Sequence, residues 1–209
     1  MALPYILKYI SEGEHQTQDF KMRIDDSKKI ARTLAAFANS DGGRLLIGVK
    51  DNGQIAGVNF DEEIHMLDAA AKMYCKPNVE YIIQAWKVEN RTVLEVNIEA
   101  SSKKPHTAIN EENEWKIYIR HDDRILPAPA VLKEYWKGTE IDRQQRYFHT
   151  EKEKKIFDSL QSHGELSFSQ LLKHCGLRKD ILIKLLAGFM RWDLIDMKFE
   201  NDTAKYFLK

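Results

Sequence analysis

The sequence predicts an α+β protein, in which a mixed sheet with packed helices is followed by a small C-terminal domain of helices and a hairpin. Up to residue 137, the segments follow one another as strand, helix, hairpin, helix, hairpin and strand. This order is not the regular alternation that produces a parallel βαβ sheet. From residue 151 the periodicity becomes helical, until two short strand-like segments close the sequence. A length of 209 residues also exceeds the usual size of one domain.

The first predicted helices and strands are indicated by the alternation of polar and apolar residues and by glycines that end helices. Residues 3–10 predict a short helix or strand. "TQDFKMRI" predicts a strand with Phe20, Met22 and Ile24 on one face, because alternate residues of a strand share a face. "KKIARTLAAFANS" predicts a helix, since its apolar residues recur at helical spacing and acidic residues before it supply N-caps. The glycine pair that follows is typical of a helix end.

The middle of the chain predicts two hairpins, a helix and a further strand. "RLLIGVKD" and "QIAGV" read as strands joined at Asn52-Gly53, a dipeptide that favours tight hairpin turns. A helix is expected in "EEIHMLDAAAKMYCK". "EYIIQAWKVE" and "TVLEVNIEA" form the second hairpin, with its turn at Asn90-Arg91. "EWKIYIRHDD" predicts one more strand, and "APAVLKEYWKG" a short helix ended by glycine.

A polar segment separates this domain from the C-terminal one. We expect a first domain over residues 1–137, a linker over 138–150 and a second domain over 151–209. The second domain contains three predicted helices, with Gly164 and Gly176 at the turns, and a final hairpin split by Asn201-Asp202. Three helices and a hairpin in so short a segment are the outline of a winged helix-turn-helix.

The composition excludes several classes of protein. Equal numbers of basic and acidic residues, 32 of each, argue against a broadly cationic nucleic-acid binder, although a local basic face is compatible with them. No apolar stretch approaches the length that spans a bilayer, and the N-terminus lacks a signal-peptide pattern, so we expect a cytoplasmic protein without membrane contact. Cys75 and Cys175 lie 100 residues apart, without the spacing of a zinc site.

Several short motifs recur in an order that identifies a family. An acidic residue, then Asp-Phe-Lys, is followed by Ala-Phe-Ala-Asn, a Gly-Gly turn and "GVKDNGQIAG". This succession resembles the Schlafen AlbA_2 domain, also described as divergent AAA-4. "KKPHTA" and "IYIRHDD" resemble its later Lys-Pro and Tyr-x-Arg elements. The resemblance covers residues 11 to about 130 and implies an AlbA_2-like mixed sheet. The chain has no GxxxxGK[ST] string, so the sequence does not support ATP binding.

The resemblance implies a candidate catalytic and metal-binding set. Family members with ribonuclease activity use three carboxylates, which correspond here to Glu14, Asp19 and Asp51. Clustered carboxylates can hold Mg²⁺ or Mn²⁺ for phosphodiester cleavage. Glu14 and Asp19 are an odd number of residues apart, so Glu14 must precede the strand for the two to converge. The alternative interpretation is that the acids are structural and that Asp51 is a hairpin residue beside Asn52-Gly53.

Basic residues in both domains are candidate nucleic-acid contacts. Those of the first domain flank its motifs, and those of the second lie on "RKDILIKLLAGFMRWDLI", the candidate recognition helix. The set comprises Lys21, Arg23, Arg44, Lys104, Arg120, Arg178, Lys179 and Lys184. The second domain has only a small excess of positive charge for a DNA-binding domain, since residues 150–209 carry 11 basic and 9 acidic residues, a net charge of +2.

These observations favour a nucleic-acid-binding protein, with DNA preferred over RNA, that acts in transcriptional regulation. In this interpretation the protein is not an enzyme and needs no cofactor, and we expect a homodimer because two half-sites give winged helices their specificity. The first alternative is a divalent-metal-dependent endoribonuclease of Schlafen type, with Mg²⁺ or Mn²⁺ as its cofactor. The second alternative is a protein-interaction module.

Overall fold

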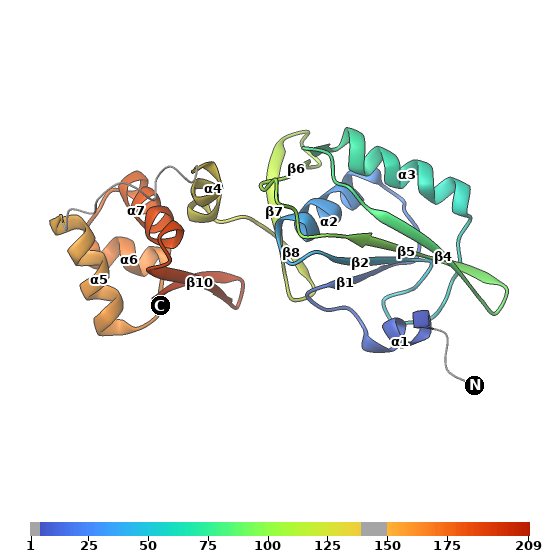
Figure 1. The fold of residues 1–209 in the computed structure, drawn as a ribbon, viewed down its shortest axis with the longest axis horizontal. Helices are drawn as coiled ribbons and strands as arrows, with labels where there is room; N and C mark the ends of the chain where they lie inside the picture. Colours follow the sequence, from blue (N-terminus) through green and yellow to red (C-terminus); the bar gives the residue numbers. More distant parts are fainter. Residues whose placement is uncertain (1–4, 139–149) are drawn as a thin grey trace. The chain divides into compact units, whose positions relative to one another are not determined.

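The computed structural model describes residues 5–138 and 150–209. By their internal contacts the residues form two compact units, Met1–Pro127 and Ala128–Lys209. Helices, a mixed sheet and an antiparallel sheet occur together in the first unit, so the expected α+β class is confirmed (Figure 1). No helix of the described part of the chain has the length and apolar character needed to cross a membrane.

The sheet at the centre of the first unit is mixed. Its strands lie in the order β1 (Gln18–Lys21), β2 (Gly43–Ile47), β5 (Arg91–Ile98) and β4 (Ile82–Val88). β1 and β2 are parallel, whereas β2–β5 and β5–β4 are antiparallel. Parallel pairing of β1 and β2 requires a crossover, which α2 (Ser27–Asn39) supplies. The carboxyl ends of β1 and β2 therefore meet at one edge of the sheet.

Each face of this sheet is covered by different helices. α2 and α3 (Phe60–Met73) pack on one face, against alternate residues of β2 and β5 such as Leu45, Ile47 and Leu94. α1 (Tyr5–Glu12) packs on the other face, where Ile6 contacts a cluster that includes Phe20 and Leu46. The period-two alternation of the strands thus divides their side chains between two cores.

A second, antiparallel sheet packs beside α2. It contains the strands β3 (Cys75–Lys76), β6 (Thr107–Ile109), β7 (Trp115–His121) and β8 (Arg124–Pro127). The sequence predicts β7 but misses the other three, because they are too short to show alternation. The side chain of Asn39, at the end of α2, holds this sheet: its amide donates to the carbonyls of His106 and Tyr118, and its oxygen accepts from the His106 N–H.

The glycine pair after α2 is required by close backbone contacts. Gly42 has a φ of +74°, and a Cβ there would lie 2.7 Å from the Ile98 carbonyl oxygen. Gly43 has a φ of +150°, and its Cβ would meet the Phe37 ring at 2.5 Å. Only glycine combines these backbone conformations with this close packing.

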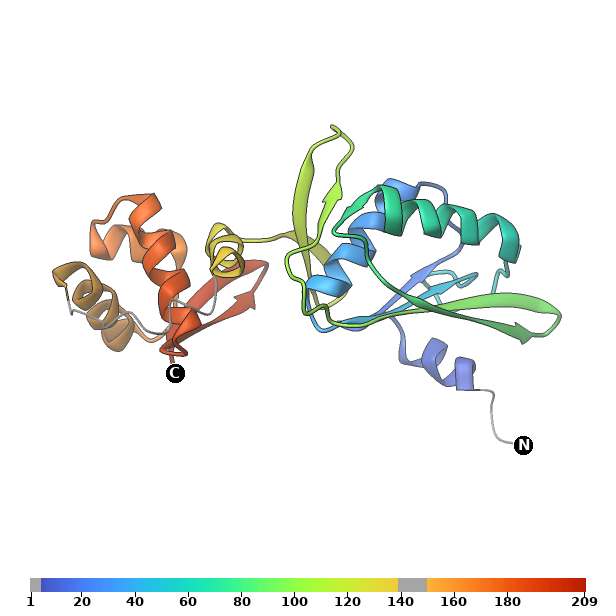
Figure 2. The same ribbon diagram turned by 45° about the horizontal axis from the view of Figure 1, so that its top comes forward.

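Three sequence expectations in this unit are wrong in part. The first strand ends at Lys21 and does not reach Ile24, because the Ile24 N–H donates to Glu63 on α3, and Met22 is exposed. The hairpin at Asn52-Gly53 forms its turn, with the Lys50 N–H bonded to the Gln54 carbonyl. Its second strand, however, is reduced to an isolated bridge between Val49 and Ile55. The β4–β5 hairpin forms and is long in both views (Figures 1 and 2), but its turn is Glu89-Asn90, one residue before the expected Asn90-Arg91.

The second unit begins with α4 (Ala130–Lys137), which the sequence analysis placed in the first domain. Val131 of α4 is buried in the core of the second unit, and the Arg191 guanidinium donates to the carbonyls of Glu134 and Tyr135. A cation at the C-terminal carbonyls of a helix is a stabilising arrangement. Apart from Gly138 and Thr150, the expected linker lies outside the described residues.

The rest of the second unit has the three helices and final hairpin that the sequence predicts. The elements are α5 (Glu151–His163), β9 (Leu166–Ser167), α6 (Phe168–Cys175), α7 (Lys179–Arg191), β10 (Ile195–Glu200) and β11 (Thr203–Leu208). The strands form a sheet in the order β10-β11-β9. Capping boxes begin α5 at Thr150 and α6 at Ser167, and Gly176 ends α6 in the left-handed conformation.

Candidate functional site

The opening acidic motif lies at the start of β1. Glu14 precedes the strand, and its side chain reaches the strand, where Oε1 accepts a hydrogen bond of 2.8 Å from the Phe20 N–H. Burial raises the pKa of Glu14; the Phe20 N–H and Lys21 oppose the rise, whereas Asp19 and Asp51 add to it. The structure therefore brings the three predicted carboxylates into one electrostatic neighbourhood, with Glu14 before the strand as the odd spacing requires.

Asp19 is buried between two cations. Its Oδ1 lies 3.1 Å from Arg120 Nη1, and its Oδ2 lies 2.6 Å from Lys21 Nζ. The contact to Lys21 is an ion pair without hydrogen-bond geometry, since Oδ2 has no hydrogen-bond donor. The Arg120 guanidinium also donates to the carbonyls of His15 and Gln18. Asp19 and Arg120 thus form a buried ion pair that fixes the start of β1 against β7.

The acidic residues do not fit a divalent metal ion in this arrangement. Among the residues that the structure describes, no group of three His, Cys, Asp or Glu side chains is placed to hold a metal. Mg²⁺ and Mn²⁺ require carboxylate oxygens that face the ion. Here both oxygens of Asp19 face Arg120 and Lys21, and Asp51 is exposed in the turn after β2. This arrangement therefore does not support a metal-dependent step.

Two of the predicted nucleic-acid contacts are engaged inside the first unit. Arg120 is buried by its bonds to Asp19 and the main chain, so it has no surface on which to meet a phosphate. Lys104 Nζ donates to the Ser40 carbonyl at 2.8 Å, and burial lowers the pKa of Lys104. Both side chains hold the turn after α2 and strand β7, which is a structural role.

The other predicted contacts of the first unit differ in their exposure. The Arg44 guanidinium stacks on the Tyr9 ring, 3.3 Å from its centroid. Lys21 is partly exposed and paired with Asp19, and Arg23 is exposed beside Asp25. These side chains lie on β1, β2 and the loop after β1, and Lys21 shares its partner Asp19 with the buried Arg120.

In the second unit the predicted contacts lie at the start of α7. Arg178 precedes the helix and forms two hydrogen bonds of 3.1 Å with Asp180. Lys179 and Lys184 lie on the helix and are exposed. The N-terminal half of α7 therefore presents two lysines to solvent, while its apolar side, including Leu182, Leu186 and Phe189, is buried.

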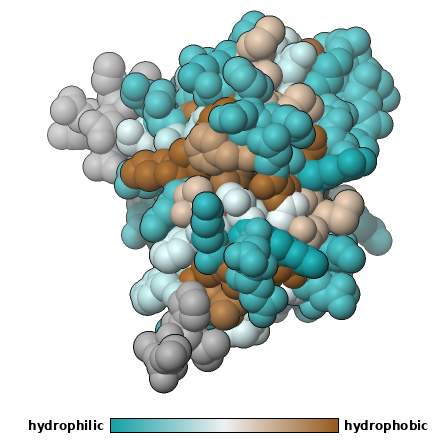
Figure 3. Space-filling model, turned by 90° about the vertical axis from the view of Figure 1, so that its right-hand side faces the viewer, coloured by the Kyte–Doolittle hydropathy of each residue, from teal (hydrophilic) through white to brown (hydrophobic). Residues whose placement is uncertain are grey.

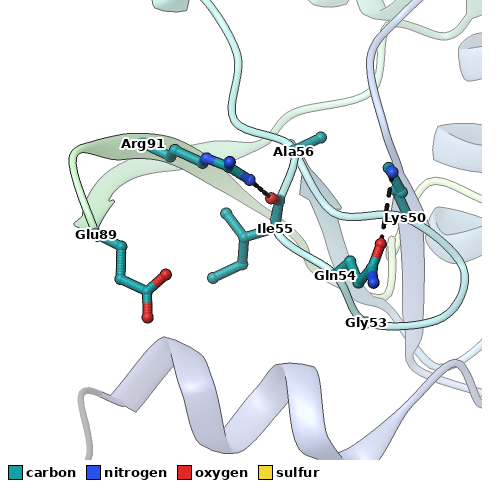
Figure 4. Close-up of a pocket in the computed structure, with 7 residues that line it drawn as sticks. All are labelled: Lys50, Gly53, Gln54, Ile55, Ala56, Glu89 and Arg91. Atoms are coloured by element: carbon teal, nitrogen blue, oxygen red, sulfur yellow. Dashed lines mark hydrogen bonds between the residues drawn. The ribbon is translucent and has the colours of Figure 1, made fainter.

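A pocket of about 770 Å³ lies where β1 and β2 end, and the sequence analysis did not identify it (Figure 4). It is lined by Lys50, Gly53, Gln54, Ile55, Ala56, Glu89 and Arg91. Lys50 precedes the turn after β2 and contacts Gln54, and Arg91 begins β5 and donates to the Ile55 carbonyl. In the sequence, Lys50 and Arg91 each lie in or beside a predicted turn. The two residues come together only because β2 and β5 are neighbours in the sheet.

The pKa of Glu14 gives a test of this acidic neighbourhood. The shift is upward, so the folded state binds more protons than the unfolded state, and stability falls as pH rises through the ordinary pKa of Glu and above it. Glu14→Gln removes the charge and keeps an oxygen that can accept from Phe20. We expect its urea midpoint to exceed that of the wild type at pH 7 and to equal it at pH 3. Equal midpoints at both pH values would contradict the shift.

The surface of the first unit is mainly hydrophilic on the side shown in Figure 3, with hydrophobic side chains reaching the surface between the polar ones. Large exposed apolar residues of this unit include Tyr5, Phe60, Met73 and Ile82. Single exposed apolar residues are ordinary on a protein surface and do not by themselves indicate a site.

In a comparison with known proteins, the chain matches a protein family and is similar to solved structures. The family described as Schlafen, AlbA_2 matches residues 14–129. No curated protein matches the chain. The chain is similar to the solved structure of the DIP2311 protein from Corynebacterium diphtheriae, with 20% identity and a TM-score of 0.43, over 64% of this chain and 25% of that one. It is also similar to the N-terminal domain of a protein from Nitrosomonas europaea described as related to the DNA helicase RecG, with 22% identity and a TM-score of 0.39, over 53% of this chain and 78% of that one.

Proposed function

The chain belongs to the Schlafen AlbA_2 family, and on that premise we propose that it binds nucleic acid at the end of the central sheet where β1 and β2 terminate. The observation that carries this proposal is the pocket in Figure 4, which is lined by the exposed side chains of Lys50 and Arg91. Two cations beside an open pocket suit phosphate groups, whose contacts supply most of the sequence-independent affinity for nucleic acid.

The neighbouring charges limit where a phosphate can enter. Glu89 lines the same pocket, and Asp51 is exposed in the turn beside it, so the entry is flanked by negative charge. Lys21, at the end of β1, is already paired with Asp19. The proposed phosphate contacts are therefore Lys50 and Arg91, and the affinity is expected to weaken steeply with salt.

For the second unit we propose a winged helix that contacts DNA. The support is the order α5, β9, α6, α7 and a β10–β11 hairpin, together with Lys179 and Lys184 exposed on α7. In winged helices the N-terminal residues of the corresponding helix face the bases and the hairpin faces phosphate. A DNA ligand, a homodimer on paired half-sites and a role in transcriptional regulation belong to this proposal.

The experiment is a fluorescence-anisotropy titration of duplex DNA and of tRNA at several salt concentrations. Lys50→Ala/Arg91→Ala is expected to weaken binding about tenfold and to reduce the slope of log K against log salt by nearly 2, because each lost phosphate contact removes about 0.9. Lys72→Ala/Lys76→Ala is the control, because these exposed lysines lie in the last turn of α3 and in β3, outside the lining of the pocket, and are expected to leave the slope less affected. Equal slopes for the two double variants would overturn the proposal for the pocket.

The ligand and the nuclease alternative are tested in the same samples. Tighter binding of the duplex than of tRNA would support DNA as the ligand, and the reverse would make RNA the ligand. Mn²⁺ is added to the tRNA sample, and the products are separated on a denaturing gel. If the wild type cleaves tRNA and Asp51→Ala does not, the protein is a nuclease and the proposed binding function is wrong. Asp51 is exposed in a turn, so this change is not expected to disturb the fold.

A further inference from the structure

A serine and a histidine are hydrogen-bonded beside a second pocket, away from the acidic motif. Ser101 Oγ lies 2.7 Å from His106 Nε2, and His106 Nδ1 lies 2.9 Å from the Pro77 carbonyl oxygen. A carbonyl oxygen can only accept, so Nδ1 carries the proton of the neutral ring and Nε2 is the acceptor. The Ser101 hydroxyl therefore donates to His106 Nε2, which is the arrangement of a nucleophile and its base.

Hydrogen bonds to the end of α2 hold the main chain of both residues. The His106 N–H and carbonyl are bonded to the Asn39 side chain, and His106 is 3% exposed. The Ser101 N–H donates to the Ala38 carbonyl at 2.8 Å, and the Lys103 N–H donates to Ser101 Oγ at 3.0 Å. The dyad is thus anchored to the C-terminal end of α2 and does not depend on flexible side chains.

The pocket beside the dyad has a volume of about 610 Å³, which suits a small molecule. Ser101 and His106 both line it, so an acyl group bound there would lie beside Ser101 Oγ. Val79 and Ala38 form an apolar part of the pocket wall. The charged side chains that line the pocket are Lys103, Glu80 and Glu99. These opposite charges favour a small uncharged substrate over a strongly anionic one.

We propose that Ser101 is an acyl-accepting nucleophile and His106 its general base, and that the pocket hydrolyses small carboxylic esters. Ser101 Oγ bonds to the ester carbon while its proton passes to His106 Nε2. The C–O bond to the leaving group then breaks, and the same proton goes to the departing alcohol. Water repeats the two steps on the acyl-serine and releases the acid. The Pro77 carbonyl orients the imidazole and bonds to the N–H of the imidazolium that forms.

The charge state of His106 agrees with this role. Burial lowers the pKa of His106, Lys103 and Lys104 lower it further, and the hydrogen bond to Pro77 opposes them. The imidazole is therefore neutral and able to accept a proton at pH 7. We expect the acylation rate to rise with pH through a pKa below 6.5 and to be constant at neutral pH. Hydroxide attack without the dyad would instead rise tenfold per pH unit.

The test uses the full chain and two probes, p-nitrophenyl acetate and an alkyl fluorophosphonate. The wild type is expected to gain the mass of one phosphonyl group, and peptide sequencing is expected to place it on Ser101. Ser101→Ala is expected to lose the adduct and to slow ester hydrolysis about 100-fold. Ser102→Ala is the matched control, because this neighbouring serine is exposed and outside the dyad, and it is expected to behave as the wild type.

A wild-type chain that gains no adduct, or an adduct and a hydrolysis rate that persist in Ser101→Ala, would overturn the proposal. The pH profile is measured on the wild type. It therefore tests His106 as the base without a substitution that could unfold the chain. A rate that rises without a plateau would also overturn the role of His106. None of these results bears on nucleic-acid binding, which uses the opposite end of the sheet.

Discussion

Replacing Arg120 with methionine is expected to destabilise the first unit by about 3–5 kcal/mol, the usual cost of removing one partner from a buried ion pair. The guanidinium of Arg120 is buried and donates to Asp19 and to the carbonyls of His15 and Gln18. Without it, Asp19 keeps only Lys21 as a cationic neighbour, and the carbonyls at the start of β1 lose a donor. Lysine would not restore the site, because it lacks the planar, forked donors of arginine.

The measurement needs a signal from the first unit alone, since a chain with two units need not unfold in one step. Trp136→Phe/Trp192→Phe leaves Trp86 and Trp115, both in the first unit, as the tryptophans that report urea unfolding. Arg23→Met is the control, because Arg23 is exposed and its ion pair with Asp25 is expected to contribute less than about 1 kcal/mol. Adding Asp19→Asn to Arg120→Met should recover part of the loss. A cost below 1 kcal/mol for Arg120→Met would contradict the buried pair.

Local signals in the sequence account for much of the fold. α2 is predictable because its apolar periodicity, the cap at Asp26 and the glycine pair all act within the segment itself. The β4–β5 hairpin is predictable for the same reason, although its turn, with positive φ at Glu89 and Asn90, lies one residue before the expected one. β3, β6 and β8 are not, since strands of two to four residues are defined by their partners in the sheet and not by their own pattern.

The site is predictable only in part, because charge in a sequence does not reveal whether a side chain faces solvent. Asp19 and Asp51 both raise the pKa of Glu14, but among the described residues the three carboxylates are not placed to hold a metal. Arg120 is a basic residue that the fold buries as the partner of Asp19, and its sequence context gives no sign of this. Conversely, Lys50 and Arg91 are far apart in the chain and share a pocket because β2 and β5 are neighbours in the sheet.

Asn39 shows how one side chain of a sequence motif can position a site that the motif does not contain. Its amide closes three hydrogen bonds to buried main-chain groups of His106 and Tyr118. These bonds tie the end of α2 to β7 and to the residue before β6. Asn39 therefore sets the main-chain position of His106, on which the contact with Ser101 depends.

Asn39→Ala is accordingly expected to cost about 3 kcal/mol or more, because three buried polar groups lose their partner at about 1–3 kcal/mol each. Asn39→Asp should cost at least as much, since a carboxylate of the same shape cannot donate to the carbonyls of His106 and Tyr118. Gln84→Ala, at an exposed position of β4, is the control and should change stability by less than about 0.5 kcal/mol. Urea unfolding followed through Trp86 and Trp115 measures the loss. Phosphonylation of the folded fraction should slow with it, because His106 would no longer be fixed against Ser101. A stable Asn39→Ala variant that is labelled at the wild-type rate would show that His106 is positioned without Asn39.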